Sequence, residues 1–170
     1  KGLTNIDIYK YAKKLNIEEF RGVFMRDTLP RTPYPKECGI VNLNTSRESG
    51  SHWVCYFKDE DNDDKKNTRI YFDSFGQVTP MEIQKYLKTK EEYETEKPVI
   101  QRNTDIVQHI NTHVCGHLCL FVLTSLTREH RSFQDVLDYQ CNLSRLDGNH
   151  YIVYVTDANF QLSHHLQADY

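Results

Sequence analysis

The sequence of 170 residues has no long apolar segment and no excess of positive charge. Its longest apolar run, residues 118–123, is far shorter than the roughly 20 residues that a membrane-spanning helix needs. No segment resembles a signal peptide. Lysine and arginine number 21 against 24 aspartate and glutamate, which gives a net charge of −3. We therefore expect no membrane partner, and the net charge does not support nucleic acid as a partner.

Cysteine is also scarce, and its spacing follows no framework. An odd number of cysteines in a chain of this size argues against a disulfide-stapled module. We therefore expect free thiols and an intracellular, reducing location. Internal repeats and low-complexity tracts are absent as well. The five cysteines are Cys38, Cys55, Cys115, Cys119 and Cys141.

What is present suits one α+β domain spanning residues 1–170. Hydrophobic residues make up 38% of the chain and aromatic residues 12%, including 11 Tyr and 8 Phe, which is enough for a packed core. Apolar spacing and capping patterns predict four helices, the first capped by Thr4 and Asp7 and the second by Thr79. We expect the third, apolar helix to be central. The predicted helices cover residues 5–15, 80–93, 115–127 and a stretch from 133 onward; the predicted strands cover 22–25, 38–43, 53–58, 69–72, 99–102 and 150–155.

Two segments are expected to form loops. Residues 28–36 contain three prolines and should be extended. Residues 59–68 read Asp-Glu-Asp-Asn-Asp-Asp-Lys-Lys-Asn-Thr, and we expect a solvated hairpin loop there. A calcium loop is the alternative use of these acids, but the central glycine and terminal glutamate of the EF-hand pattern are missing.

Cys115 directly precedes the long apolar helix. A helix N-terminus favours an anion, and a thiol must ionise before it attacks a carbonyl group. His52, at the start of a predicted strand, could form an ion pair with the thiolate and then act as general acid. Asp73, at the end of the next strand, could orient that imidazole. Gln108 is the candidate donor to the oxyanion, beside the backbone N–H of Cys115.

Four neighbouring residues are candidates for substrate binding. Gly116 would leave room for a substrate backbone next to the nucleophile. Trp53 would pack near His52 and screen it from solvent, although a core position suits this aromatic residue equally well. Gly50 and Ser51 directly precede His52.

Each of these residues also has a purely structural explanation. A cysteine before an apolar helix is usually a small core residue, as we expect for Cys119, and Asp-Ser-Phe-Gly at residues 73–76 would make an ordinary turn. The order His, Asp, Gln, Cys in one small chain is what favours catalysis. A cluster of His and Cys residues around Cys115 could suggest a zinc site, but it lacks the paired ligand spacing of structural zinc sites. We therefore expect no metal. Its ligands would be His109, His113, Cys115, His117 and Cys119.

In combination, the motifs resemble those of the adenain-like cysteine proteases, the adenovirus endopeptidase family. The segment at residues 38–53, ending in Gly-Ser-His-Trp, is similar to the one that leads to the family's catalytic histidine. Phe-Asp-Ser-Phe-Gly at residues 72–76 is similar to its carboxylate turn, with Asp73 where the adenovirus enzyme has glutamate. Gln108 and Cys115 match the oxyanion glutamine and the nucleophile at the same separation. The resemblance covers most of residues 4–128, and residues 130–170 diverge from it.

This resemblance implies the adenain-like fold of the clan that includes the SUMO proteases, with a central nucleophile helix packed on a mixed sheet. It also implies a virion-maturation endopeptidase that cleaves capsid or core precursor proteins near small residues such as Gly. Viruses, Maverick/Polinton transposons, adintoviruses and virophages encode similar proteases. The location would then be the virion and the host nucleus or cytoplasm, and we expect a monomer.

Two features depart from the adenovirus enzyme, which is activated by a disulfide-linked peptide and by DNA. Residues 96–107 contain no cysteine to hold such a peptide, and the chain is net acidic, so the sequence requires no cofactor. Two other functions fit the same motifs. One is a deconjugating protease for SUMO or another ubiquitin-like modifier, and the other is a catalytically dead protein-binding module.

Overall fold

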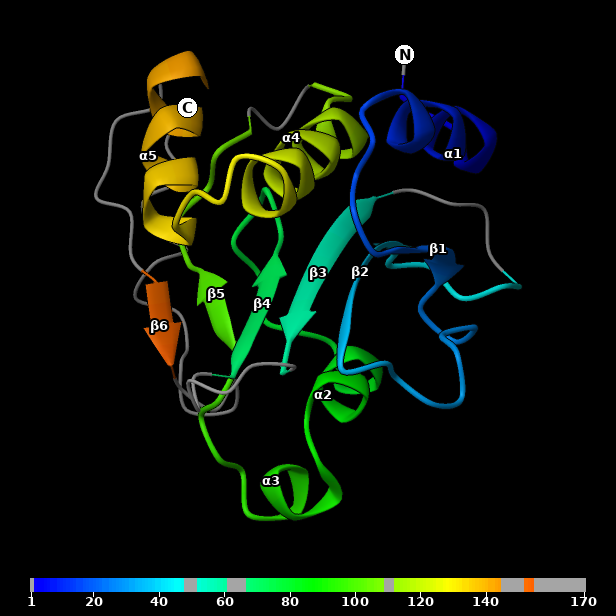
Figure 1. Ribbon diagram of the computed structural model, residues 1–170, viewed down its shortest axis with the longest axis vertical. Coiled ribbons are helices and arrows are strands. Elements are labelled where there is room, and N and C mark those ends of the chain that lie inside the picture. Colours follow the sequence, from blue (N-terminus) through cyan, green and yellow to red (C-terminus); the bar gives the residue numbers. More distant parts are fainter. Residues whose placement is uncertain (1, 48–51, 61–66, 109–111, 145–151, 155–170) are drawn as a thin grey trace.

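A six-stranded mixed sheet runs through the centre of the protein (Figure 1). The computed structural model describes residues 2–47, 52–60, 67–108, 112–144 and 152–154. The strands lie side by side in chain order; β1–β2 and β4–β5 are parallel pairs, and the other neighbouring pairs are antiparallel. Their bounds are β1 Phe20–Met25, β2 Lys36–Asn42, β3 Trp53–Asp59, β4 Thr68–Phe72, β5 Gln101–Asn103 and β6 Ile152–Tyr154.

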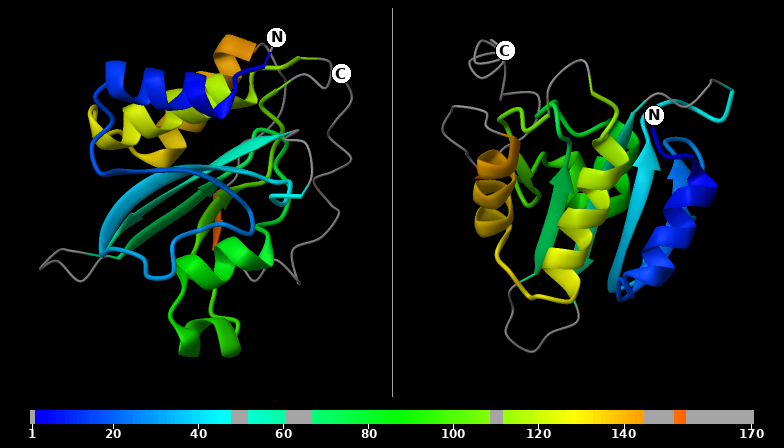
Figure 2. Two further views of the ribbon diagram at one scale, coloured as in Figure 1. Left: turned by 90° about the vertical axis from the view of Figure 1, so that its right-hand side faces the viewer. Right: turned by 90° about the horizontal axis from the view of Figure 1, so that it is seen from above.

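Helices cover both faces of the sheet (Figure 2). Three of them, α1, α4 and α5, lie on one face, and α2 packs on the other, followed by α3. Among the described helices, none is long and apolar enough to cross a membrane. Their bounds are α1 Asn5–Lys14, α2 Met81–Leu87, α3 Lys90–Glu94, α4 Cys115–Thr127 and α5 Phe133–Ser144.

Strand β3 contributes to the cores on both faces. Trp53 and Cys55 belong to the core under α1, α4 and α5, whereas Val54 and Tyr56 belong to the core under α2. Successive side chains of a strand point to opposite faces, so a strand covered on both sides has to be apolar throughout. The site therefore rests on a strand that is fixed from both sides.

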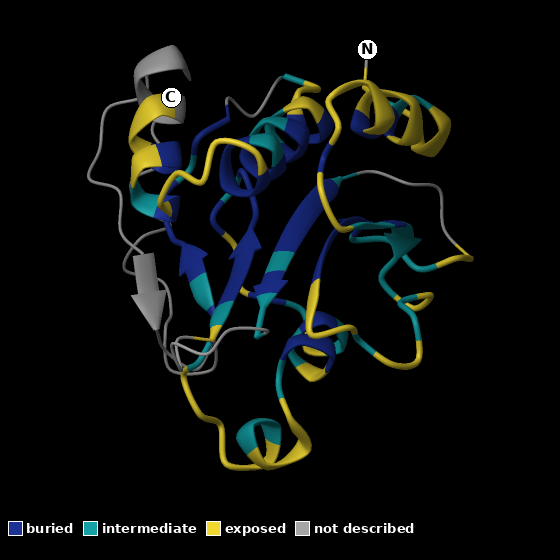
Figure 3. Ribbon diagram, viewed as in Figure 1, coloured by how far each residue is buried: buried dark blue, intermediate teal, exposed yellow. Residues whose placement is uncertain are grey.

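Helix α4 is largely buried (Figure 3). Nine of its 13 residues are buried, against two of ten in α1. A helix that is apolar on nearly all sides is stable only inside the protein. The predicted central helix at residues 115–127 is therefore confirmed, and its first residue is Cys115.

The predicted cap of the first helix is found, and the start of α5 is capped as well. The Thr4 hydroxyl accepts from the Asp7 N–H, and the Asp7 carboxylate accepts from the Thr4 N–H, which closes a capping box. The Ser132 hydroxyl accepts from the Asp135 N–H at 3.2 Å at the start of α5. Such caps satisfy N–H groups that have no partner within the helix.

The strands follow the prediction with one shift. The expected strand at residues 99–102 begins two residues later, as β5. The expected terminal strand at residues 150–155 is present as β6, which pairs with β5. β3 and β4 form the predicted hairpin, and residues 61–66 of its loop lie outside the described residues.

The predicted helix at residues 80–93 is wrong, because two short helices occupy this region. Lys88 has an extended backbone, with φ −101° and ψ 152°, which ends α2. Thr89 then starts α3 through a capping box with Glu92, a Thr-x-x-Glu pattern that favours a new helix start. Thr79 is not the N-cap of α2; Pro80 holds that position without a side-chain cap.

Candidate active site

The three candidate catalytic side chains meet at one edge of the sheet. His52 directly precedes β3, and Asp73 directly follows β4. Because β3 and β4 are antiparallel, the start of one lies beside the end of the other. Helix α4 packs over β3, and its first residue, Cys115, accepts a hydrogen bond at Sγ from the Trp53 backbone N–H at 3.4 Å. Segments far apart in sequence thus bring a thiol, an imidazole and a carboxylate together.

His52 is the middle member of the three side chains. Nε2 of His52 lies 2.7 Å from Oδ1 of Asp73. This leaves Nδ1 for Cys115, and each of these two groups shifts the pKa of the other. The Asp73 side chain is 1% exposed, and its carboxylate also accepts from the N–H groups of Phe75 at 2.9 Å and Gln77 at 3.3 Å. A carboxylate held by backbone donors can keep the imidazole in one orientation.

The electrostatics of the site favour an ion pair. Although burial opposes the change, the pKa of Cys115 is lowered by the hydrogen bond and charge of His52 and by the backbone N–H groups of Trp53 and Gly116. Burial likewise opposes protonation of His52, yet hydrogen bonds to Asp73 and Cys115 and their negative charges raise the pKa of His52 to about 10. Both shifts favour the thiolate–imidazolium pair over the neutral pair.

The ring of Phe75 covers one face of the candidate histidine. The Phe75 and His52 rings stack with centroids 4.9 Å apart and an interplanar angle of 29°. A protonated imidazole is attracted to the face of an aromatic ring, and the ring also keeps water from that side. Phe75 lies in the same turn as Asp73, so one turn holds the histidine from two directions. In the sequence Phe75 is recognisable only as a turn residue, because no local pattern marks the stacking.

Strand β5 braces the turn that carries Asp73. The side-chain amide of Asn103 accepts from the Asp73 N–H at 3.1 Å and donates to the Asp73 carbonyl at 2.6 Å. Arg102 donates to the Gly76 carbonyl at 3.3 Å. Both β5 side chains are buried, and both were missed in the sequence because neither belongs to a recognisable motif. The brace fixes the backbone of the carboxylate residue rather than its side chain.

Gly76 is required for this brace. Its φ of +64° lies in the left-handed region, and a Cβ would come within 2.4 Å of the Thr104 carbonyl oxygen. We expect Gly76→Ala to lower the free energy of unfolding by about 2 kcal/mol or more, because strain and a backbone clash add up. Thermal unfolding measures this loss. Gly2→Ala, whose Cβ would lie 3.8 Å from its nearest neighbour, is the matched stability control; equal stability of the two variants would contradict the prediction.

Both the oxygen and the nitrogen of the Gln108 side-chain amide are hydrogen-bonded. The oxygen is bound to the turn that carries Asp73, and the nitrogen to the segment just before α4. Its Oε1 accepts from the Ser74 hydroxyl at 2.5 Å, and its Nε2 donates to the Thr112 carbonyl at 2.9 Å. The residue is 2% exposed and lines the same cleft as Cys115. The structure thus brings the fourth candidate residue to the other three.

The N-terminal segment fills the space next to Gly116. A Cβ on Gly116 would lie 3.2 Å from Cδ1 of Leu3 and 3.2 Å from Cδ1 of Trp53. The Trp53 indole N–H donates to the Leu3 carbonyl at 3.0 Å. The expectation that Gly116 leaves room for a substrate is therefore corrected, because this space holds the chain's own Leu3 and Trp53. Trp53 is 9% exposed, and it belongs both to the core and to the cleft wall.

A cleft with a volume of about 940 Å³ opens over Cys115, His52 and Gln108. Its other walls include residues 2–5 and residues 23–25 of β1. The volume lies in the usual range for ligand sites, about 300–1,000 Å³. Gly50 and Ser51, the remaining candidates for substrate binding, lie outside the described residues.

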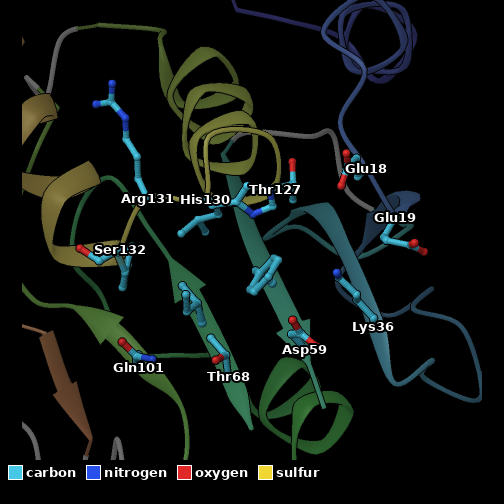
Figure 4. Close-up of a pocket in the computed structure, with 14 residues that line it drawn as sticks. Glu18, Glu19, Lys36, Asp59, Thr68, Gln101, Thr127, His130, Arg131 and Ser132 are labelled. Carbon is cyan, nitrogen blue, oxygen red and sulfur yellow. The ribbon is translucent and has the colours of Figure 1, made fainter. Parts of the chain in front are cut away.

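A second hollow, of about 350 Å³, lies at the other end of α4, beside Thr127 (Figure 4). At 1.5 Å per residue, the length of this 13-residue helix places it about 18 Å from Cys115. Glu18, Lys36 and Arg131 give this hollow charges of both signs, and no cysteine is among its lining residues. The thiol chemistry therefore belongs to the larger cleft.

The predicted absence of a metal site stays a prediction. Among the described residues, no group of three or more His, Cys, Asp or Glu side chains is placed to hold a metal ion. His113 and His117 are exposed, whereas Cys119 is fully buried in the core, where burial raises the pKa of its thiol. His109, another ligand of the alternative zinc site, lies outside the described residues.

No protein-family model matches the sequence, and no curated protein matches it. Among solved structures, the ASFV pS273R protease superposes with a TM-score of 0.50 and 17% identity, over 80% of this chain and 61% of that one. A selenomethionine structure of the same protease gives a TM-score of 0.48 and 16% identity, over 82% and 64% of the two chains. The structure of AvrA delL154 with IP6 and CoA gives a TM-score of 0.41 and 18% identity, over 82% of this chain and 53% of that one.

The present chain thus spans about three fifths of the length of the ASFV protease. An identity of 17% establishes a shared fold and no more. The protein has a mixed α+β fold with a central helix packed on a mixed sheet, as the sequence predicted, and it shares this fold with the ASFV pS273R protease.

Proposed function

We propose that the protein is a cysteine endopeptidase of a virus or virus-like mobile element. The observation that carries the proposal is the series of Cys115, His52 and Asp73: His52 is hydrogen-bonded to Asp73, and His52 and Cys115 line one open cleft. The fold shared with a viral protease supports the same class. The substrates would be capsid or core precursor polypeptides cut near small residues such as Gly, and the enzyme would act as a monomer.

The reaction follows from the charges of the site. The Cys115 thiolate attacks the scissile carbonyl carbon, and the carbonyl oxygen becomes an oxyanion next to the Cys115 backbone N–H and the Gln108 amide. His52 then transfers its proton to the amine that leaves, and a thioester remains on Cys115. Water, deprotonated by His52, hydrolyses that thioester and regenerates the thiolate. Asp73 holds the imidazole throughout and stabilises its positive charge.

The direct test is incubation of the protein with peptides that carry Gly-Gly or Gly-x-Gly before the cut, followed by mass spectrometry of the products. We expect cleavage after the glycine-containing motif. We also expect iodoacetamide to modify Cys115 faster than the other cysteines, by about tenfold or more at pH 6.5, because the pKa of the Cys115 thiol is lowered. Peptide mapping assigns the modified residue.

Two other outcomes would overturn the proposal. Labelling of Cys115 by a vinyl-sulfone probe built on SUMO or ubiquitin, without cleavage of free peptides, would identify a deconjugating protease. Equal alkylation rates at all cysteines, without cleavage of any peptide, would identify a binding module on an inactive scaffold.

A further inference from the structure

We propose that Ser74 is a positioning residue for the oxyanion donor, an inference that rests on the proposed proteolytic function. Ser74 follows Asp73 in the turn and is 0% exposed. Its hydroxyl donates to Oε1 of Gln108 at 2.5 Å. Because this hydroxyl is fully buried and donates to the amide oxygen, it can hold the Gln108 amide in position.

A hydrogen-bond donor holds one end of the Gln108 amide, and a hydrogen-bond acceptor holds the other. The Thr112 carbonyl accepts from Nε2, which sets the nitrogen end, and the Ser74 hydroxyl holds the oxygen end. An amide flipped by 180° would point its oxygen at the Thr112 carbonyl oxygen, and two acceptors would then face each other. These two contacts orient the amide plane, and removal of the Ser74 hydroxyl would take away the one at the oxygen end.

The hydrogen bond from Ser74 also changes the strength of the donor. A hydrogen bond accepted by an amide oxygen draws electron density from the amide nitrogen, which strengthens the N–H groups of Gln108 as donors. Position matters as much as strength, because an oxyanion donor acts when it lies about 2.7–3.1 Å from the developing charge. Loss of the Ser74 hydroxyl would weaken both properties without removing Gln108.

The backbone around Ser74 makes this contact rigid. The Ser74 carbonyl accepts from the N–H of Val107, the residue before Gln108, at 2.8 Å. The two segments are thus joined twice, once through backbone and once through side chains. Because Asp73 is the neighbouring residue, one short turn holds both the carboxylate that orients His52 and the amide of Gln108. Among the described residues, the hydrogen bonds of Ser74 go to Gln108 and Val107 and not to Cys115 or His52, so its effect should be confined to the oxyanion.

The test is Ser74→Ala, with separate measurements of kcat, KM and thiol reactivity. We expect kcat for peptide hydrolysis to fall by about tenfold to 100-fold, less than or equal to the loss of one whole oxyanion donor. We expect KM to stay within about twofold, because the ground-state carbonyl carries little charge. A peptide aldehyde, which forms a hemithioacetal with its oxygen in the oxyanion position, should bind more weakly by the same factor as kcat falls.

Alkylation by iodoacetamide distinguishes this role from a merely structural one, because general damage to the site would also change the alkylation rate of Cys115. This reaction displaces iodide and forms no oxyanion, so its rate and pH profile at Cys115 should be unchanged in Ser74→Ala. Ser125→Ala is the matched control: it also deletes a buried hydroxyl, and within the described part of the chain that hydroxyl has no hydrogen-bond partner. Ser125 lies ten residues beyond Cys115 on α4, and its loss should leave kcat unchanged.

A double-mutant cycle with Gln108→Met tests whether Ser74 affects kcat through Gln108. This substitution removes the amide at nearly constant side-chain volume. If Ser74 acts through Gln108, Ser74→Ala should change kcat by less than about twofold in the Gln108→Met background. Losses that multiply would overturn the inference. So would a folded Ser74→Ala variant with the kcat of the wild type, or one in which alkylation falls together with kcat.

The proposed function and this inference fail in different ways. A wild-type protein that cleaves no peptide, or cleaves equally well after Cys115→Ala, would contradict the protease assignment. A wild-type protein whose activity needs Cys115 but tolerates Ser74→Ala would contradict only the role of Ser74.

Discussion

Replacement of Cys115 by alanine is expected to reduce peptide hydrolysis by at least about 10⁴-fold while the protein stays folded. The thiolate forms the covalent intermediate, and water bound in the cleft cannot replace it at a comparable rate. Alanine differs from cysteine only by the loss of the sulfur atom, which accepts a hydrogen bond from the Trp53 N–H at 3.4 Å, so the change should cost little stability. Turnover of a fluorogenic peptide and thermal unfolding measure the two quantities.

Cys119→Ala is the matched control, because it removes a second thiol one helical turn further along α4. Cys119 is 0% exposed, and burial raises the pKa of its thiol, so it offers no nucleophile to the cleft. We expect turnover within about threefold of the wild type and a loss of about 1 kcal/mol of stability from the vacated volume. Turnover that survives in Cys115→Ala, or disappears in Cys119→Ala, would contradict the assignment of the nucleophile.

The positions that the structure brings together could be predicted because each lies at the end of a secondary-structure element. Cys115 is the first residue of an apolar helix, His52 directly precedes a strand and Asp73 directly follows the next one. Such boundaries are visible in the pattern of apolar residues. Antiparallel pairing of the two strands then requires that His52 and Asp73 share an edge. The central helix and the fold class followed from the same patterns.

The parts that support the site could not be predicted in this way. Asn103 braces Asp73 from 30 residues away, and Leu3 reaches Trp53 from 50 residues away. Contacts over such separations depend on how strands and termini pack, and a single asparagine or leucine leaves no periodic pattern. The break before Thr89 was different in kind, because its capping box was visible but the apolar spacing across it favoured one longer helix.

Each of the four residues in the turn at 73–76 has a separate role in holding the site together. Asp73 holds His52 by a hydrogen bond, and Phe75 holds the same ring by stacking. Ser74 reaches the Gln108 amide, and Gly76 permits the close approach of the β5 segment. In the sequence these residues are equally consistent with an ordinary strand-exit turn. Only their partners distinguish the two interpretations.

Replacement of His52 by alanine should also remove nearly all hydrolysis, by about 10⁴-fold, because no group remains to protonate the leaving amine. The same change should alter the pH dependence of Cys115 alkylation. Burial acts to raise the pKa of this thiol, and the hydrogen bond and charge of His52 act to lower it. Without His52 the pKa must rise, so alkylation at pH 6.5 should fall by about tenfold or more.

The full pH profile separates this electrostatic effect from a loss of structure. In the wild type, alkylation should decline as the pH falls through the lowered pKa of Cys115, and hydrolysis should also decline above pH 10, because His52, with a pKa of about 10, loses its proton there. In His52→Ala, alkylation should recover at high pH, where hydroxide forms the thiolate unaided. His117→Ala, the removal of an exposed histidine on α4, should leave the profile unchanged. A His52→Ala profile identical to that of the wild type would mean that the imidazole does not set the charge of Cys115, and the proposed ion pair would have to be abandoned.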